Sequence, residues 1–314
     1  MRIERLAHLI AVARGDKPAD LLLTNARIVN PLTGEIEIGS VAIAEGRVAG
    51  LGDYTTSRET RDLGGRFLAP GLIDGHVHLE SSQLTPGEYS RAVVPHGTTA
   101  IVADLHEVAN VAGLAGMREI MRQARRLPLT CFFTAPSCVP ATTLESGGAS
   151  ISVDEIRRVL RWPNVVGVGE LMDFAAVVAG DPMALAKAQA AGRLALDGHA
   201  PGLCGKALNA YLAAGVGSDH ESTELEEGRE KLRRGAHLMI REGSSERNLE
   251  ALLPLVTDET YHRCLFVTDD RGPVDLLRGG DMDALVRKAI LLGLAPIRAL
   301  QLVVYAGLRK RRGL

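Results

Sequence analysis

Eight apolar, β-rich runs recur along this chain from residue 68 onward, and helical stretches separate them. The runs cover residues 68–77, 98–104, 129–135, 164–171, 194–199, 213–219, 236–241 and 263–269. Between them, residues 116–124 and 153–160 have the spacing of amphipathic helices. Eight strands that alternate with helices predict an α/β protein built as a (β/α)8 TIM barrel. The main alternative is a doubly wound open sheet, but the Gly-rich phosphate loop expected there has no good match in this sequence.

The segment before the barrel has a different pattern. Residues 1–19 predict an amphipathic N-terminal helix, because apolar residues recur at helical spacing. Residues 20–69 alternate short strands with Asn-, Pro- and Gly-containing turns, which predicts part of a small β-sandwich. The barrel is then expected over residues 70–303. Residues 304–314 contain a run of four basic residues and no strand pattern, so we expect a divergent basic tail.

Composition excludes several classes of partner. The 314 residues carry a formal net charge of −2, which gives no electrostatic reason to expect nucleic acid or a membrane surface as a partner. No apolar run is long enough for a membrane span. The four cysteines form no Cys-x-x-Cys pair and are expected to be reduced core residues of a cytoplasmic protein. A homo-oligomer is compatible with these features.

Histidines and carboxylates stand where the predicted strands end. His76 and His78 lie two positions apart at the end of the first run, so their side chains point the same way. The other strand-end residues are Asp104, His106, Glu170, His199, His220, Asp269 and Asp270. In a barrel these ends form one face, where catalytic residues collect. Imidazole and carboxylate ligands suit Mn, Fe or Zn, so the pattern predicts a metal site.

This ligand set is large enough for two ions. A shared carboxylate can bridge two cations about 3.5–4 Å apart, and such ions lower the pKa of bound water from about 15.7 towards 7. A nearby aspartate can then move the proton of the nucleophile to the leaving group, which typically contributes about 10²–10⁴-fold in rate. Asp269 is the candidate for this role. Asp270 is less suited, because strand alternation would turn it to the opposite side, and Glu80 is a further alternative.

Six motifs carry a family resemblance across roughly residues 20–303. They are His76-Val-His-Leu-Glu-Ser-Ser82, Asp104-Leu-His-Glu-Val-Ala-Asn-Val111, Asp197-Gly-His-Ala-Pro-Gly-Leu203, Ser218-Asp-His-Glu221, Ile240-Arg-Glu-Gly-Ser244 and Phe266-Val-Thr-Asp-Asp-Arg271. In this order they resemble the bacterial adenine deaminase family of the amidohydrolase superfamily. The resemblance implies a metal-bearing (β/α)8 barrel beside a small β-sandwich. It also implies hydrolysis of adenine to hypoxanthine and ammonia.

The resemblance also implies roles for individual residues. The metal and catalytic positions are matched by His76, His78, Glu170, His199, His220 and Asp269. Glu170 takes the bridging place that a carboxylated lysine fills in many relatives. Asp104 and His106 correspond to positions beside the metals, either as a further ion site or as supporting residues. The implied cofactors are two divalent ions, Mn²⁺ first, with Fe²⁺ or Zn²⁺ as alternatives.

Two other functions stay open at this point. One is a cyclic-amide hydrolase such as a dihydroorotase or hydantoinase relative; a lysine at the end of the fourth strand would favour it, but Glu170 stands there. The other is a barrel that binds metal without turnover. The resemblance stops near residue 302 whereas relatives continue, so we expect an arbitrary end that leaves apolar edges of residues 20–69 exposed and the chain poorly soluble or weakly active.

Overall fold

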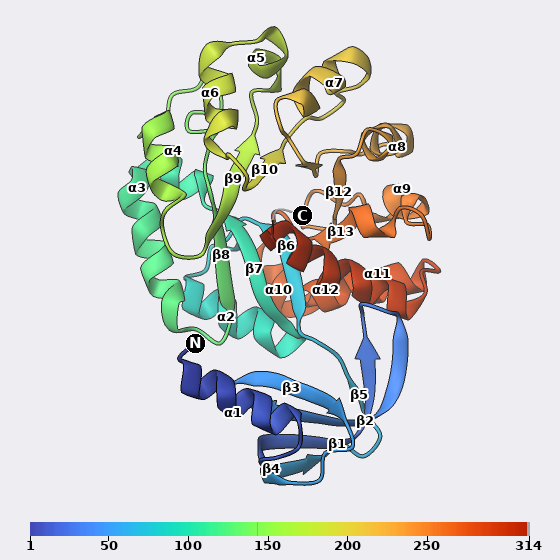
Figure 1. Ribbon diagram of the computed structural model, residues 1–314. Helices are drawn as coiled ribbons and strands as arrows, with labels where there is room; N and C mark the ends of the chain where they lie inside the picture. Colours follow the sequence, from blue (N-terminus) through green and yellow to red (C-terminus); the bar gives the residue numbers. More distant parts are fainter. Residues whose placement is uncertain (143, 313–314) are drawn as a thin grey trace. The chain divides into compact units, whose positions relative to one another are not determined.

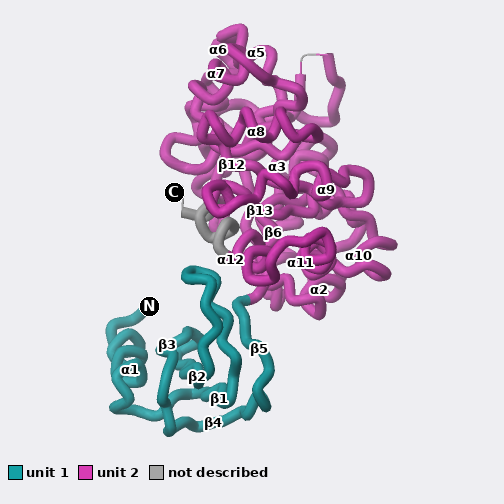
Figure 2. The backbone as a smooth tube through the Cα atoms, turned by 90° about the vertical axis from the view of Figure 1, so that its right-hand side faces the viewer, with its two compact units in different colours: residues 1–70 teal, residues 71–314 magenta. Residues whose placement is uncertain are grey.

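The computed structural model describes residues 1–142 and 144–312, and it divides the chain into two compact units. The first unit is Met1–Pro70 and the second begins at Gly71 (Figure 2). None of the helices in the described part of the chain is long and apolar enough to cross a membrane. Among the cysteines, 131, 138 and 264 are buried and free, but Cys204 is free and exposed, so the expectation of a core position is wrong for that residue.

The first unit contains one helix and one sheet. Its elements are α1 (Ile3–Ala13), β1 (Ala19–Asn30), β2 (Glu35–Ala44), β3 (Arg47–Gly52), β4 (Ser57–Asp62) and β5 (Phe67–Leu68). The strand order is β3-β2-β1-β4, and β5 pairs with the later part of β1. Turns at residues 31–34 and 45–46, of the Asn-, Pro- and Gly-containing kind expected from the sequence, join antiparallel neighbours. These strands form a single layer within the described residues.

The second unit is built on eight parallel strands, which confirms the predicted barrel. They are β6 (Leu72–Val77), β7 (Thr98–Asp104), β8 (Thr130–Ala135), β9 (Val165–Leu171), β10 (Ala195–Gly198), β11 (Ser218–Asp219), β12 (His237–Arg241) and β13 (Cys264–Val267). Each strand pairs with its sequence neighbour, in the order β13-β12-β11-β10-β9-β8-β7-β6. Right-handed crossover helices surround such a sheet and cover its outer face, as Figure 1 shows.

The helices follow the strands as the alternating pattern predicted. They are α2 (Pro86–Val93), α3 (His106–Gln123), α4 (Val153–Val159), α5 (Phe174–Ala179), α6 (Pro182–Ala190), α7 (Gly205–Ala213), α8 (Leu225–Arg233), α9 (Leu249–Leu252), α10 (Pro273–Gly279), α11 (Met282–Leu291) and α12 (Pro296–Arg312). Short 3₁₀ turns occur at η1 (Glu80–Ser82), η2 (Val94–His96), η3 (Ala124–Arg126), η4 (Leu253–Leu255) and η5 (Tyr261–Arg263).

Three boundaries differ from the sequence prediction. The sixth strand has two residues, Ser218–Asp219, whereas the apolar run was predicted at 213–219: residue 213 ends α7 and residues 214–217 connect the two elements. Helix α3 spans His106–Gln123 with a kink at Gly113, so the helix predicted at 116–124 corresponds to its later part and His106 lies on its first turn. Helix α12 continues through most of the predicted tail, and residues 313 and 314 lie outside the described residues.

The barrel closes at its first and last strands. An isolated parallel bridge joins Val77 to Asp269. The Asp269 N–H donates to the carbonyl of His76 at 3.0 Å, and the His78 N–H donates to the carbonyl of Asp269 at 3.2 Å. Backbone pairing therefore fixes Asp269 directly between the two histidines of the first strand.

Candidate active site

The carboxylate of Glu170 lies at the centre of the predicted ligand residues. Its Oε1 atom is 3.0 Å from Nε2 of His78 and 3.3 Å from Nε2 of His76. Its Oε2 atom is 2.6 Å from Nδ1 of His199 and 3.6 Å from Nε2 of His220. The Glu170 side chain is 1% exposed. Each carboxylate oxygen thus faces a different pair of histidines.

Neighbouring strands hold Glu170 in this position. The Glu170 N–H donates to Oδ2 of Asp104 at 3.0 Å, and the Ser137 hydroxyl donates to the Glu170 carbonyl at 2.5 Å. The residue before Glu170 must be very small, since a Cβ on Gly169 would stand 2.0 Å from Oδ2 of Asp104. Asp104, predicted either as an ion site or as a support, is fully buried and supports the backbone that carries Glu170.

His76, His78 and Asp269 form one side of the centre. Oδ1 of Asp269 is 3.3 Å from Nε2 of His76 and 3.2 Å from Nε2 of His78, and the two Nε2 atoms are 3.2 Å apart. Nδ1 of His78 lies 3.1 Å from the carbonyl of Asp104, which fixes the ring so that Nε2 faces the centre. His106 lies at the edge of this side, with Nδ1 3.6 Å from Oε1 of Glu170.

His199 and His220 form the other side, together with a carboxylate to which sequence reasoning gave no role. Oε1 of Glu221 is 3.2 Å from Nε2 of His220 and 3.5 Å from Nδ1 of His199. Arg241, at the end of β12, contacts Glu221 at 2.5 Å and 3.1 Å through its two terminal nitrogens. The same Arg241 reaches Oδ2 of Asp269 at 3.2 Å. Glu221 and Arg241 both lie in sequence motifs that carry the family resemblance. Those motifs are the one signal in the sequence that could have indicated a role for them.

The electrostatics of the site favour cations at its centre. Burial alone would lower the pKa of His76, but hydrogen bonds to Asp269 and Glu170 raise it to about 9. Burial alone would raise the pKa of Glu170, but the charge of His220 and hydrogen bonds from His199, His76 and His78 hold it well below its usual value. The pKa of Asp269 is lowered in the same way by His76 and His78. The carboxylates therefore stay ionised and attract positive charge.

The donor set fits divalent metal ions. Ligand atoms bound to one ion at about 2.0–2.2 Å stand roughly 3 Å apart, which is the spacing of the nitrogen and oxygen atoms described above. Oε1 of Glu170 is buried and has no hydrogen bond of favourable geometry, so its lone pairs are available. Groups able to hold an ion include His76–His78–Asp269, His76–Glu170–His220 and His78–His106–Glu170. These clusters are the metal-binding candidates of the site.

A pocket of about 270 Å³ opens onto these groups. Its lining includes six carboxylates and one arginine, together with the histidines and Met172. Arg241 is that arginine, and its guanidinium is committed to Glu221 and Asp269. Glu246, from the loop after β12, also lines the pocket and was not predicted.

Asp270 departs from the prediction that it would point away from the site. It lines the same pocket as Asp269 and accepts a short hydrogen bond from the Ser81 hydroxyl. The reason is local: β13 ends at Val267, and Asp269 has φ 57°, a left-handed conformation in which strand alternation no longer applies. Glu80 was the other alternative to Asp269 for proton transfer. Its carboxylate accepts a hydrogen bond from the Val108 N–H at 3.2 Å.

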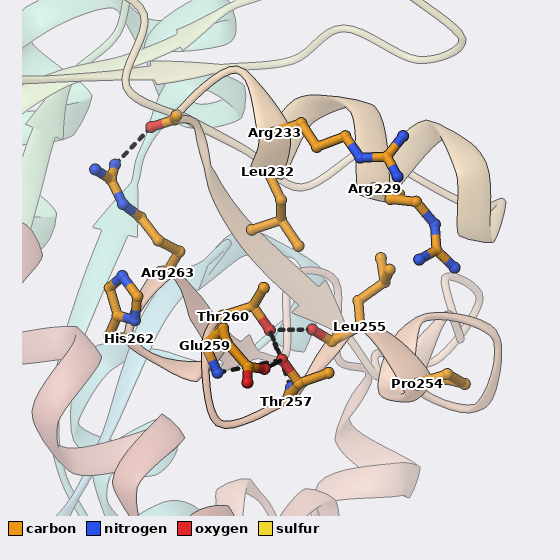
Figure 3. A pocket seen from close by; sticks show the side chains of 11 residues that line it. Arg229, Leu232, Arg233, Pro254, Leu255, Thr257, Glu259, Thr260, His262 and Arg263 are labelled. Carbon is orange, nitrogen blue, oxygen red and sulfur yellow. Dashed lines mark hydrogen bonds between the residues drawn. The ribbon is translucent and has the colours of Figure 1, made fainter.

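A larger pocket, of about 440 Å³, has a different character. Gly235 and Arg263 in its lining precede β12 and β13, so this pocket lies at the strand beginnings, away from the histidines. Figure 3 shows Arg229 and Arg233 extending along its rim, while Arg263 donates to the Gly235 carbonyl at 2.6 Å. Thr257, Glu259 and Thr260 hydrogen-bond to one another there, and none of the possible metal-ligand clusters among the described residues includes a residue of its lining, so it is not the candidate active site.

The chain resembles known proteins in sequence and in fold. Residues 67–307 match the amidohydrolase family. The chain is 56% identical over 297 residues to an adenine deaminase of Dehalococcoides mccartyi, covering 95% of this chain and 52% of that protein. It is 49% identical over 313 residues to an adenine deaminase of Desulfatibacillum aliphaticivorans, covering 98% and 55%. The chain therefore spans about half the length of these curated relatives.

A solved structure supports the fold alone. A dihydroorotase crystal structure superposes with a TM-score of 0.64 at 15% sequence identity, covering 94% of this chain and 85% of that one. At 15% identity, this similarity supports the barrel fold and does not indicate which substrate the chain binds.

Proposed function

Since this chain belongs to the amidohydrolase family, we propose that it hydrolyses adenine to hypoxanthine and ammonia at a site that holds two divalent ions. The observation that carries the proposal is Glu170, whose two oxygens face separate pairs of histidines. The names of the relatives with 49–56% identity supply the substrate. Adenine is then a small-molecule partner for the pocket beside Glu170.

The ligand assignment follows the two sides of the site. His76, His78 and Asp269 would hold one ion and His199 and His220 the other, with Glu170 shared between them. Mn²⁺ is the proposed metal, because two carboxylates among the ligands favour a harder ion, with Fe²⁺ or Zn²⁺ as alternatives. When bound, such ions polarise the substrate and lower the pKa of water from about 15.7 towards 7. His106 and Asp104 are proposed as supports of this ligand set.

Side chains of the protein would then transfer a proton during the reaction. Asp269 would accept the proton of the attacking water as the oxygen bonds to C6 of adenine. It would return that proton to the amino group as the C6–N bond breaks, which gives ammonia and hypoxanthine. Arg241, 3.2 Å from Oδ2 of Asp269, fixes the second oxygen of the carboxylate and leaves Oδ1 directed at the centre.

The charge of the pocket distinguishes adenine from the cyclic-amide alternative. Six carboxylates line it, and its one arginine is already paired. Adenine presents N–H donors and no anionic group, so it suits these acceptors. Dihydroorotate carries a carboxylate, which would need a free cation to balance it. The one arginine of the pocket, Arg241, does not supply that cation, because it is paired with Glu221 and Asp269.

Ammonia release from adenine by protein reconstituted with Mn²⁺ tests the proposal. Adenosine and dihydroorotate serve as alternative substrates, and Asp269→Asn with the same metal loading is the matched control for background hydrolysis. Turnover of adenine that is absent in the control supports the proposal. Turnover of dihydroorotate instead would favour a cyclic-amide hydrolase. Two bound ions without turnover of any of the three would favour a metal-binding barrel that is not an enzyme by itself.

A further inference from the structure

A buried lysine lies behind the His199–His220 side of the site, and the chemistry proposed above does not use it. Lys231 is on α8, its side chain is 1% exposed, and it does not line the pocket. Its Nζ donates to Oδ2 of Asp219 at 2.7 Å, to Oε1 of Glu227 at 2.8 Å and to the carbonyl of Ala200 at 2.8 Å. All three protons of the ammonium are therefore used.

The acceptors of Lys231 belong to two loops that carry ligand histidines. Ala200 directly follows His199, and Asp219 directly precedes His220. Oδ1 of Asp219 also accepts the N–H of Ala200 at 2.9 Å, so both backbone groups of Ala200 are bound. The Lys231–Asp219 pair thus ties the end of β10 to the end of β11.

Glu227 extends the same network to both loops. Its Oε1 accepts the N–H of Gly202 at 2.8 Å, and its Oε2 accepts the N–H of Thr223 at 3.3 Å. Oδ2 of Asp219 accepts the N–H of Glu221 at 3.1 Å. One ammonium is therefore shared by two carboxylates, buried Asp219 and part-buried Glu227, and each of them accepts backbone N–H groups from the loops that follow His199 and His220.

The helix that carries Lys231 is built for close approach. Gly228 and Lys231, three positions apart, form the buried face of α8. A Cβ on Gly228 would stand 2.8 Å from a methyl carbon of Leu255, so a larger residue would require the Leu255 side chain or the helix to move. With glycine there, the helix lies close enough for the lysine to reach the strand ends.

We infer that Lys231 is a positioning residue that fixes His199 and His220 relative to each other, and through them the ion on their side of Glu170. Removing the ammonium would leave Asp219 and Glu227 as buried carboxylates without a cation, and these would repel or take up water. Both loops would then lose their common anchor. His76, His78 and Asp269 are held instead by the β6–β13 backbone pairing, which Lys231 does not touch.

This inference rests on the proposed two-ion site, and it predicts an asymmetric loss of metal. Mn²⁺ titration of metal-free Lys231→Met protein, followed by metal counting and by electron paramagnetic resonance of the bound ions, should show one ion retained. The second ion should bind about 10–100-fold more weakly, which is the usual cost of losing a partner that orients a ligand. The spectrum of a coupled ion pair should be lost at metal concentrations that saturate the wild type.

Two further variants separate positioning from general instability. Leu285→Ala opens a cavity in the core beside α11 and should lower the melting temperature while two ions still bind with wild-type affinity. Glu227→Gln keeps the Lys231–Asp219 pair and should weaken the same second ion to a smaller extent, which keeps the inference testable if Lys231→Met does not fold.

The outcomes distinguish this inference from the proposed function. If the wild type binds two ions and Lys231→Met binds both unchanged, the inference is wrong and the two-ion site stands. Equal weakening of both ions, or the same loss in Leu285→Ala, would also overturn it by pointing to instability. A wild type that binds fewer than two ions would overturn the two-ion proposal and this inference with it.

Discussion

Both ends of the barrel carry ionisable side chains, but these side chains are arranged differently at the two ends. At the strand ends, the side chains of Glu170, His76 and His220 are 1–2% exposed, and the two imidazoles lie 3.3 Å and 3.6 Å from the Glu170 carboxylate. At the strand beginnings, a larger pocket is rimmed by arginines whose side chains pair locally, as Arg229 does with Glu226 at 3.0 Å. Cavity size therefore does not locate the chemistry. The useful signal is buried charge from several strands that converges on one point.

This contrast predicts the largest effect for Asp269. Asp269→Asn should lower the rate of adenine hydrolysis by about 10²–10⁴-fold, because the amide cannot carry the proton between water and the leaving group. Much of the metal should stay bound, since the asparagine amide still offers an oxygen atom and the four histidines and Glu170 remain. Steady-state kinetics beside metal counting checks this. Near-normal turnover would move the proton-transfer role to Asp270, which lines the same pocket.

The next largest effect is expected for His199, which is proposed as a metal ligand and not as a proton carrier. His199→Ala should reduce the bound metal from about two ions to one, because Nδ1 of His199 lies 2.6 Å from the shared carboxylate. The loss of affinity should exceed the roughly 10–100-fold cost of removing an outer supporting partner. Elemental analysis of protein purified without chelator measures it. Retention of two ions in this variant would exclude His199 as a ligand.

A smaller effect is expected from pH in the metal-free protein. The folded-state pKa of His76 is raised to about 9, so the native state binds this proton more tightly than the unfolded chain does. The resulting stability is complete below about pH 6.5 and is lost as the pH rises through about 9, by about 3 kcal/mol at most. Thermal unfolding with chelator from pH 6 to 9.5 measures the decline. Saturating Mn²⁺ should flatten it, and a metal-free protein that gains stability over this range would contradict the expectation.

The smallest effect is expected at the other end of the barrel. Arg233→Ala should change kcat/KM for adenine by less than about twofold and stability by less than about 0.5 kcal/mol, because it is an exposed substitution outside the metal site. Figure 3 shows its side chain at the rim of the arginine-lined pocket. Steady-state kinetics with adenine and thermal unfolding measure the two changes. A tenfold loss of activity would mean that the pocket at the strand beginnings is coupled to the site at the strand ends.

The sequence by itself determined the barrel and the residues that meet at its strand ends. Strand periodicity, helical spacing and the parallel order leave few other arrangements, and parallel strands bring their carboxyl ends to one face. For this reason His76, His78, Glu170, His199 and His220 could be predicted to meet before any distance was known. Each is the last residue of a strand or lies within two residues of its end.

Tertiary structure alone decided the contacts that depend on side-chain reach and local backbone conformation. Asp270 turned into the pocket because Asp269 is left-handed, which strand alternation cannot foresee. Arg241 and Glu221 paired across two strand ends, and Lys231 reached two loops from helix α8. Long flexible side chains can satisfy their charge in many ways, and only the packed positions of neighbouring elements select one of them. The periodic backbone pattern that predicts strands and helices contains no such information.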